Sequence, residues 1–210
     1  MVGQGVLREC LADPQVQRVL TIGRSVTGGP DAKLKEIVHK DFLNFAAIEE
    51  KLSGYDACFY CLGVSAFGMS EAEYQRVTYG YAMAAAETLV RLNPEMTFEY
   101  ISGAGTDSSE KGQSRWARVK GMTENALMGL PFKAVYALRP GYIQPMHGIK
   151  SKTGWYQALY MLMAPLYPIW NAILPNYVTT TEKLGRAMIA IAKRGAPGRV
   201  LENRDINALG

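Results

Sequence analysis

The hydrophobic positions along the chain follow two spacings, one typical of strands and one typical of amphipathic helices. Short runs rich in Val, Ile, Phe and Tyr predict strands, and longer segments with apolar residues three and four apart predict helices. The predicted strands are "RVLTIG", "LKEIVHKDF", "ACFYCLG", "TFEYISG" and "FKAVYALRPG". The predicted helices are "VGQGVLRECLA", "FAAIEEKL", the run from Glu71 to Leu92, residues 115–128 and "KLGRAMIAIAKRG". Strands that alternate with helices indicate an α/β fold, with a doubly wound and mainly parallel sheet covered on both faces.

Two of the predicted helices begin with the residues of a capping box. Ser70 and Glu73 stand at the start of the long run from Glu71, and Thr179 and Glu182 stand before the last helix. In this motif the hydroxyl accepts from a first-turn amide, and the Glu side chain accepts from the amide of the capping residue. We therefore expect both helices to begin at these positions.

The first predicted helix begins with Gly3 and Gly5, at the very start of the chain. In a dinucleotide-binding fold a buried strand and a glycine turn would lead into this helix and cradle the cofactor phosphates. No such strand precedes Gly3 in the sequence, so we expect a Rossmann-like sheet without its first strand. A truncated form or a misassigned start would account for this, and a flexible glycine-bearing N-terminus is the alternative.

The residues that end the predicted strands are candidates for cofactor binding, because ligands bind at the carboxyl ends of strands in such sheets. Arg24 and Ser25 follow "VLTIG", and Arg24 lies near the ~20-residue spacing from the glycine turn at which the adenosine ribose is recognised. An arginine there favours a 2′-phosphate, which indicates NADP(H) in preference to NAD(H). Asp41 is a candidate for the adenine amine, and Gly63 would let the backbone approach the cofactor.

Composition limits the classes of protein and partner. At 210 residues, with 48% hydrophobic side chains, the chain is long enough for one substantial core, so we expect a single domain over residues 1–210. The net charge of +4 is scattered, which argues against nucleic acid and suits a small anionic ligand. The three cysteines form no disulfide framework, and Cys58 and Cys61 are interpreted as core strand residues. We expect a reducing compartment and a cytoplasmic protein.

The stretch "SRWARVKG" places Trp116 and Lys120 on one face of a helix, because residues i and i+4 lie one above the other. Together with "GRS", "KDF", "CLG", "ISGAG", "LRPG" and "LENRDINALG", it resembles the atypical short-chain dehydrogenase/reductase superfamily, and within it the Tat-interacting oxidoreductase group and its bacterial NAD-dependent epimerase-like relatives. The resemblance covers the whole chain. It implies a Rossmann-type sheet, bound NADP(H), and a serine, a tyrosine and a lysine that reduce a carbonyl or oxidise an alcohol.

Each matching position inherits an expected role from this resemblance. Ser102 matches the family serine, and Lys120 matches the lysine that holds the nicotinamide ribose. Gly3 matches the last glycine of the phosphate loop, and Pro140 and Gly141 match the segment that lines the nicotinamide. The motifs "KDF" and "CLG" add Phe42 and Leu62 to the cofactor-binding residues. The family tyrosine, however, is Trp116.

Trp116 removes the proton donor of that catalytic group, because an indole N–H donates a hydrogen bond but does not titrate usefully in water. A positioned general acid is typically worth ~10²–10⁴ in rate. The proton would then come from Tyr142, from Tyr79 or Tyr81, or from a water held by Ser102 and Lys120. The sequence leaves these alternatives open. It also leaves open whether the chain is an NADP-dependent oxidoreductase or a dinucleotide-binding regulator that has lost its catalytic step.

Residues 153–181 contain no Asp, Glu, Lys or Arg. We interpret a small apolar segment at about 145–180 as a cap over a pocket for a hydrophobic small molecule or as a buried helix pair, with peripheral attachment to a membrane surface or to a partner as the second interpretation. Pro165, Pro168 and Pro175 argue against a spanning helix. His39 and His147 lie far apart in the sequence, so we expect no metal site. A monomer and a homodimer remain equally open.

Overall fold

The computed structural model describes residues 1–26, 29–149 and 175–210 of the chain. Contacts divide it into two compact units, each built from separate stretches of sequence. Unit 1 comprises Met1–Lys40, Pro140–Arg194 and Glu202–Gly210, and unit 2 comprises Asp41–Arg139 and Gly195–Leu201. Most of the predicted cap segment at about 145–180 lies outside the described residues. The described strands form three separate sheets.

Unit 2 is built on a sheet with the strand order β3-β4-β5-β8. Its strands are β3 (Ala57–Tyr60), β4 (Thr97–Ile101), β5 (Ala134–Arg139) and β8 (Val200–Glu202), the last residue of which belongs to unit 1. Strand β4 runs parallel to both β3 and β5, with Glu99 opposite Phe59 on one side and Tyr136 on the other. This arrangement confirms the predicted α/β class with a parallel sheet.

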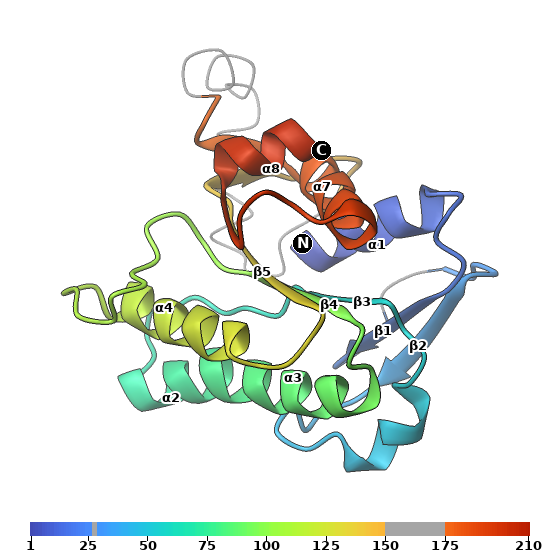
Figure 1. Ribbon diagram of the computed structural model, residues 1–210, viewed down its shortest axis with the longest axis horizontal. Coiled ribbons are helices and arrows are strands. Elements are labelled where there is room, and N and C mark those ends of the chain that lie inside the picture. Colours follow the sequence, from blue (N-terminus) through green and yellow to red (C-terminus); the bar gives the residue numbers. More distant parts are fainter. Residues whose placement is uncertain (27–28, 150–174) are drawn as a thin grey trace. The chain divides into compact units, whose positions relative to one another are not determined.

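The helices of unit 2 lie together against one face of this sheet (Figure 1). They are the 3-10 helix η1 (Ala46–Lys51), α2 (Glu71–Gln75), the π-helical turn η2 (Arg76–Gly80), α3 (Tyr81–Leu92) and α4 (Arg115–Met128). Tyr60 stacks on Phe98 and Tyr100 between these layers, and Phe98 also contacts Phe132. Burial of these rings supplies much of the apolar contact of the unit.

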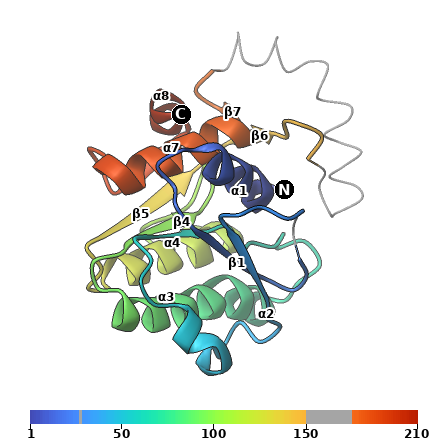
Figure 2. The same cartoon turned by 90° about the vertical axis from the view of Figure 1, so that its right-hand side faces the viewer.

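The described residues of unit 1 form two small parallel sheets and three helices, whose course can be followed in Figure 2. Its elements are α1 (Val2–Ala12), β1 (Val19–Gly23), β2 (Leu34–Val38), β6 (Tyr142–Gln144), β7 (Val178–Thr180), α7 (Thr181–Arg194) and α8 (Asn203–Leu209). Helix α1 packs on α7, and the fit is close because Gly5 lies against Thr181 and Gly185 lies against Glu9. Lys33 donates to the carbonyl oxygens of Leu11 and Asp13 and so caps the end of α1.

Two helix starts can be compared with the predicted capping boxes. The box at Ser70 and Glu73 is confirmed, since the Ser70 hydroxyl accepts from the Glu73 amide and the Glu73 carboxylate accepts from the Ser70 amide. The prediction for Thr179 is wrong, because the Thr180 hydroxyl is the group that accepts from the Lys183 amide. Thr179 is fully buried in β7, and its hydroxyl has no hydrogen-bond partner among the described residues.

Candidate functional site

The end of β4 carries Ser102, and its hydroxyl belongs to a short hydrogen-bonded chain. The Ser102 amide donates to the Leu138 carbonyl, which fixes the backbone at the end of the sheet. The Thr106 hydroxyl donates to the Gly103 carbonyl at 2.7 Å, and Ser102 Oγ lies 3.0 Å from Thr106 Oγ1. Because a hydroxyl has one proton and Thr106 donates its own to Gly103, Ser102 donates to Thr106. In this arrangement Ser102 offers a ligand only lone pairs.

Lys120 lies on α4 with its ammonium group against the end of the same strand. Its Nζ donates to the Ser102 carbonyl at 3.0 Å, approaches the Ile101 carbonyl at 3.5 Å, and lies 5.6 Å from the centre of the Tyr100 ring. Burial lowers the pKa of Lys120 to about 8, against the opposing influence of the Glu124 carboxylate. The structure thus brings Lys120 and Ser102 together, as their motifs predict.

Trp116 stands one helical turn before Lys120 and remains partly exposed, with 36% of its surface accessible. Its ring lies beside Gly105, where a side-chain carbon would be 3.6 Å from Cη2 of the indole. Gly105 has a φ of +84°, a conformation that favours glycine. The indole therefore covers the loop that follows Ser102.

Glu124, Arg139 and Thr106 also position this part of unit 2. None of the three was predicted as a site residue from the sequence. Glu124 follows Lys120 by one helical turn, and its carboxylate pairs with the Arg139 guanidinium at the end of β5. Glu124 is only 1% exposed, so the pair joins α4 to β5 inside the unit. The i,i+4 spacing from Lys120 was the available signal for Glu124, whereas no local pattern pointed to Thr106.

The other predicted residues of unit 2 have mixed surroundings. Asp41 is exposed, and its carboxylate accepts from the Leu43 amide in a turn. Phe42 is buried and stacks on Tyr81, one of the alternative proton donors, so it has a packing role of its own. Leu62 is half-buried and Gly63 is exposed after β3, with open space where a Gly63 side chain would lie.

The remaining predicted residues belong to unit 1. Gly3 lies in the first turn of α1, whose N-terminus has no side-chain cap, and Arg24 and Ser25 are exposed after β1. Pro140 and Gly141 precede β6; the Gly141 amide donates to the Asn203 side chain. A side chain at Gly141 would collide with the Tyr177 carbonyl, so this glycine has a packing reason. The Tyr142 hydroxyl donates to Gln144.

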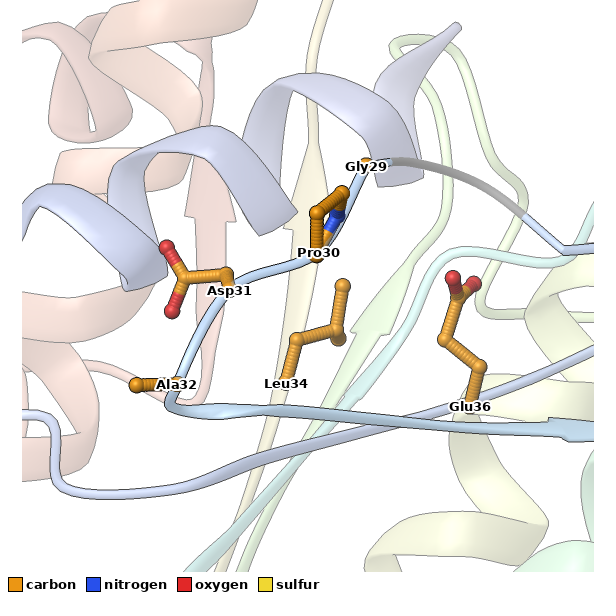
Figure 3. Close-up of a pocket in the computed structure, with 6 residues that line it drawn as sticks. All are labelled: Gly29, Pro30, Asp31, Ala32, Leu34 and Glu36. Atoms are coloured by element: carbon orange, nitrogen blue, oxygen red, sulfur yellow. The ribbon is translucent and has the colours of Figure 1, made fainter.

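A cavity of about 520 Å³ lies in unit 1 beside β2 (Figure 3). It is lined by Gly29, Pro30, Asp31, Ala32, Leu34 and Glu36. Figure 3 shows Leu34 and Glu36 on β2 below the loop that carries Pro30 and Asp31. The Glu36 carboxylate accepts from the Thr21 hydroxyl. None of the predicted site residues lines this cavity.

Neither a cluster of metal ligands nor a membrane-spanning helix occurs in the described part of the chain. Within residues 1–26, 29–149 and 175–210, no three His, Cys, Asp or Glu side chains gather closely enough to hold a metal ion. The two histidines differ in surroundings, since His39 follows β2 while His147 pairs with Glu182 at 3.0 Å. None of the helices in the described residues is long and apolar enough to cross a membrane.

Solved structures with the same fold are sugar-nucleotide epimerases and dehydratases. The UDP-N-acetylglucosamine 4-epimerase from Methanobrevibacter ruminantium has a TM-score of 0.68 at 15% identity, covering 96% of this chain and 72% of that one. The dTDP-glucose 4,6-dehydratase DesIV from Streptomyces venezuelae, solved with NAD bound, has a TM-score of 0.64 at 13% identity, covering 99% and 76%. These structures share the α/β architecture of the chain, so its fold is Rossmann-like.

Curated relatives by sequence are mitochondrial proteins named fmp52. That of Emericella nidulans is 26% identical over 95% of this chain and 86% of its own length. That of Aspergillus clavatus is 29% identical over 68% of this chain and 62% of its own length. No protein-family model matches the chain. These relatives overturn the prediction of a cytoplasmic protein, since all four that were compared are named mitochondrial. A reducing compartment inferred from three free cysteines does not distinguish the cytoplasm from an organelle.

Proposed function

We propose that the chain is a mitochondrial NADP(H)-binding oxidoreductase that acts on an apolar carbonyl or alcohol. The observation that carries the proposal is the Lys120 ammonium held against the end of β4, 3.0 Å from the carbonyl of Ser102. Ligands of this fold bind at the carboxyl ends of the strands, which is where these groups lie. The location rests on the names of the curated relatives. Membership of the Tat-interacting oxidoreductase group is part of the same proposal.

The described residues fit a dinucleotide in three respects. The N-terminus of α1 has no side-chain cap, and the amides of such a terminus bind phosphate groups. Apart from the chain neighbours of each glycine, no atom of the described residues lies within 4 Å of the positions that side chains would occupy at Gly63 and Gly103, which leaves room beside the ends of β3 and β4. Lys120 presents a charged donor to which a ribose hydroxyl can bind.

The proposed function also includes a preference for NADP(H) over NAD(H). Arg24 is exposed directly after β1, where its guanidinium can grip a 2′-phosphate with two hydrogen bonds. NADPH, when bound, would supply a hydride to the substrate carbonyl. Lys120 would orient the nicotinamide ribose, and the indole of Trp116 would present a flat face beside the reacting carbonyl.

The test is the affinity of the purified protein for NADPH and NADH, measured by calorimetry. Lys120→Met removes an ammonium whose hydrogen bonds are worth ~1.5–3 kcal/mol, so both cofactors should bind roughly 10- to 150-fold more weakly. Arg24→Ala should weaken NADPH by a similar factor and leave NADH nearly unchanged. Lys111→Met and Arg194→Ala remove one exposed charge each and serve as matched controls. Absence of cofactor binding by the unaltered protein would contradict the proposal.

A dinucleotide-binding regulator without turnover is the alternative that this experiment leaves. A regulator would give the same NADPH and NADH affinities as an oxidoreductase, so the two are distinguished by turnover. NADPH oxidation above background with a carbonyl substrate would exclude the regulator. Cofactor binding without any turnover over a broad panel of carbonyl compounds would favour it.

A further inference from the structure

Near the end of β4, the Lys120 ammonium keeps one N–H beyond its two backbone carbonyls, and the proposed function assigns that N–H to the nicotinamide ribose and not to the reacting oxygen. The indole of Trp116 does not titrate usefully. The Ser102 hydroxyl donates to Thr106, whose own proton is engaged by the Gly103 carbonyl. The Lys120 ammonium donates to the Ser102 carbonyl and approaches that of Ile101. A substrate that needs a proton at the moment of hydride transfer is therefore poorly served here.

The same part of unit 2 presents exposed apolar and aromatic side chains. Trp116 is 36% exposed at the start of α4, and Phe67 is 87% exposed in the loop after β3, where Val64 is also exposed. The Arg115 guanidinium donates to the Ala66 carbonyl, which ties this loop to the first turn of α4. Flat apolar surfaces of this kind favour a planar aromatic ligand over a hydroxyl-rich sugar.

We propose that the substrate of this site is a para-quinone, an inference that rests on the proposed oxidoreductase function. A quinone that accepts a hydride at one oxygen becomes a hydroquinone monoanion, with the negative charge on the other oxygen. The two electrons enter the ring, which becomes aromatic, and the cofactor leaves as NADP⁺. One proton from water then converts the monoanion to the hydroquinone. No proton has to arrive during hydride transfer.

The acidity of the two kinds of product explains why a quinone suits the site. A phenol has a pKa of about 10, whereas an aliphatic alcohol is a far weaker acid, comparable to bulk water. The phenolate formed from a quinone is thus a far weaker base than the alkoxide formed from a ketone. Losing a general acid, worth ~10²–10⁴ in rate, should slow ketone reduction by most of that factor and quinone reduction much less.

The decisive comparison uses two substrates and one variant under anaerobic conditions. The substrates are 2,3-dimethyl-1,4-naphthoquinone, whose substituted ring resists addition of thiols, and 1-tetralone, a ketone on the same bicyclic frame. Trp116→Tyr restores a phenol one turn from Lys120. It should raise tetralone reduction at least about tenfold and change quinone reduction less than about threefold. Equal gains for both substrates, or faster reduction of tetralone than of the quinone by the unaltered protein, would overturn the inference.

A second readout is independent of turnover. In the presence of NADP⁺, which cannot donate hydride, the quinone should shift the ¹⁵N indole resonance that disappears in Trp116→Phe. Phe67→Ser should weaken this response at least about fivefold, because one aromatic contact is lost. Val38→Ser, a change at another exposed apolar residue, is the matched control. An unshifted Trp116 resonance, with NADP⁺ bound, would refute the quinone, whereas loss of cofactor binding would refute the proposed function itself.

Discussion

Half-buried Lys120 and fully buried Glu99, both in unit 2, differ in the hydrogen-bond partners of their ionisable groups. Lys120 has two backbone carbonyls within reach of its ammonium group. Glu99, in the middle of β4, is 0% exposed, and neither of its carboxylate oxygens has a hydrogen-bond partner among the described residues. Burial raises the pKa of Glu99 well above its usual range. Burial of the Cys58 thiol, together with the nearby Glu99 carboxylate, raises the pKa of Cys58 to about 12. Glu99 is therefore neutral in the folded protein under conditions where it is ionised in the unfolded chain.

Glu99→Gln should make the protein progressively more stable, relative to the unaltered chain, as the pH rises from 5 to 8. The raised pKa means that the folded state holds a proton that the unfolded state has released, so stability falls as the pH rises from the unfolded pKa towards the folded one. A glutamine has no proton to lose and removes this dependence. Urea unfolding at both pH values measures the difference.

The matched control is Glu87→Gln, at an exposed position of α3. Its effect on the free energy of unfolding should be small and nearly independent of pH. A stability difference between Glu99→Gln and the unaltered chain that stays constant from pH 5 to 8 would show that Glu99 ionises normally in the folded protein.

At this scale the sequence predicted part of the candidate site. The motifs around Ser102 and Lys120 placed both residues, and the structure brings them within hydrogen-bonding distance. The direction of the Ser102 proton could not be predicted, because it depends on where the Thr106 hydroxyl points after the loop has folded. Arg139 was likewise missed as a site residue, since its partner Glu124 comes from a different element. The catalytic roles of Ser102 and Lys120 and the cofactor contacts at all the named positions stay predictions.

At the scale of elements, local signals fixed most boundaries. Helices α1 and α4 span the residues predicted for them, and the run from Glu71 to Leu92 is helical throughout, although a π-helical turn interrupts it. The predicted helix "FAAIEEKL" is a 3-10 helix, η1, of six residues. A 3-10 helix has about 3.0 residues per turn and an α-helix about 3.6, and over so short a stretch the spacing of apolar residues does not separate the two types.

Gly121 on α4 shows how packing overrides helix propensity. Ala is normally favoured over Gly within a helix by ~1 kcal/mol. At Gly121, however, the side-chain carbon of an alanine would lie 1.8 Å from the carbonyl oxygen of Asp107. The backbone of Asp107 is itself fixed to α4, because its amide donates to the Ala117 carbonyl. We expect Gly121→Ala to lower the free energy of unfolding by ~1–3 kcal/mol, as measured by chemical denaturation.

Gly80 in η2 provides the comparison. The nearest atom to a side-chain carbon at Gly80 is Cδ2 of Leu43, at 3.3 Å and at the end of a flexible side chain. Gly80→Ala should therefore be neutral or slightly stabilising. If Gly121→Ala were as well tolerated as Gly80→Ala, the loop around Asp107 would have to move freely away from α4.

At the scale of the whole molecule, the two units are interleaved along the chain. Unit 1 draws on three stretches of sequence and unit 2 on two, and β8 contains residues of both. Composition could not predict this division, because it reflects contacts between distant stretches. The single domain expected over residues 1–210 remains a prediction. Its test is whether heat unfolds the chain in one calorimetric transition.

The packing of α1 on α7 has a consequence for the order of events during synthesis. Helix α1 leaves the ribosome well before α7, which begins only at Thr181. At ~5–20 residues per second, the apolar face of α1 waits on the order of ten seconds or more for its partner. Residues 41–139, by contrast, contain β3, β4, β5 and the helices that cover them, so this stretch can collapse first.

Nascent chains arrested after residue 150 has emerged should therefore resist protease within residues 41–139 and be cut readily at Arg8 in α1. Full-length chains should be protected at both places, because the Glu9 carboxylate of α1 then pairs with Arg186 of α7. Protection of Arg8 in the arrested chains would mean that α1 finds another partner while it waits. Until α7 is made, α1 is a ready binding site for a chaperone.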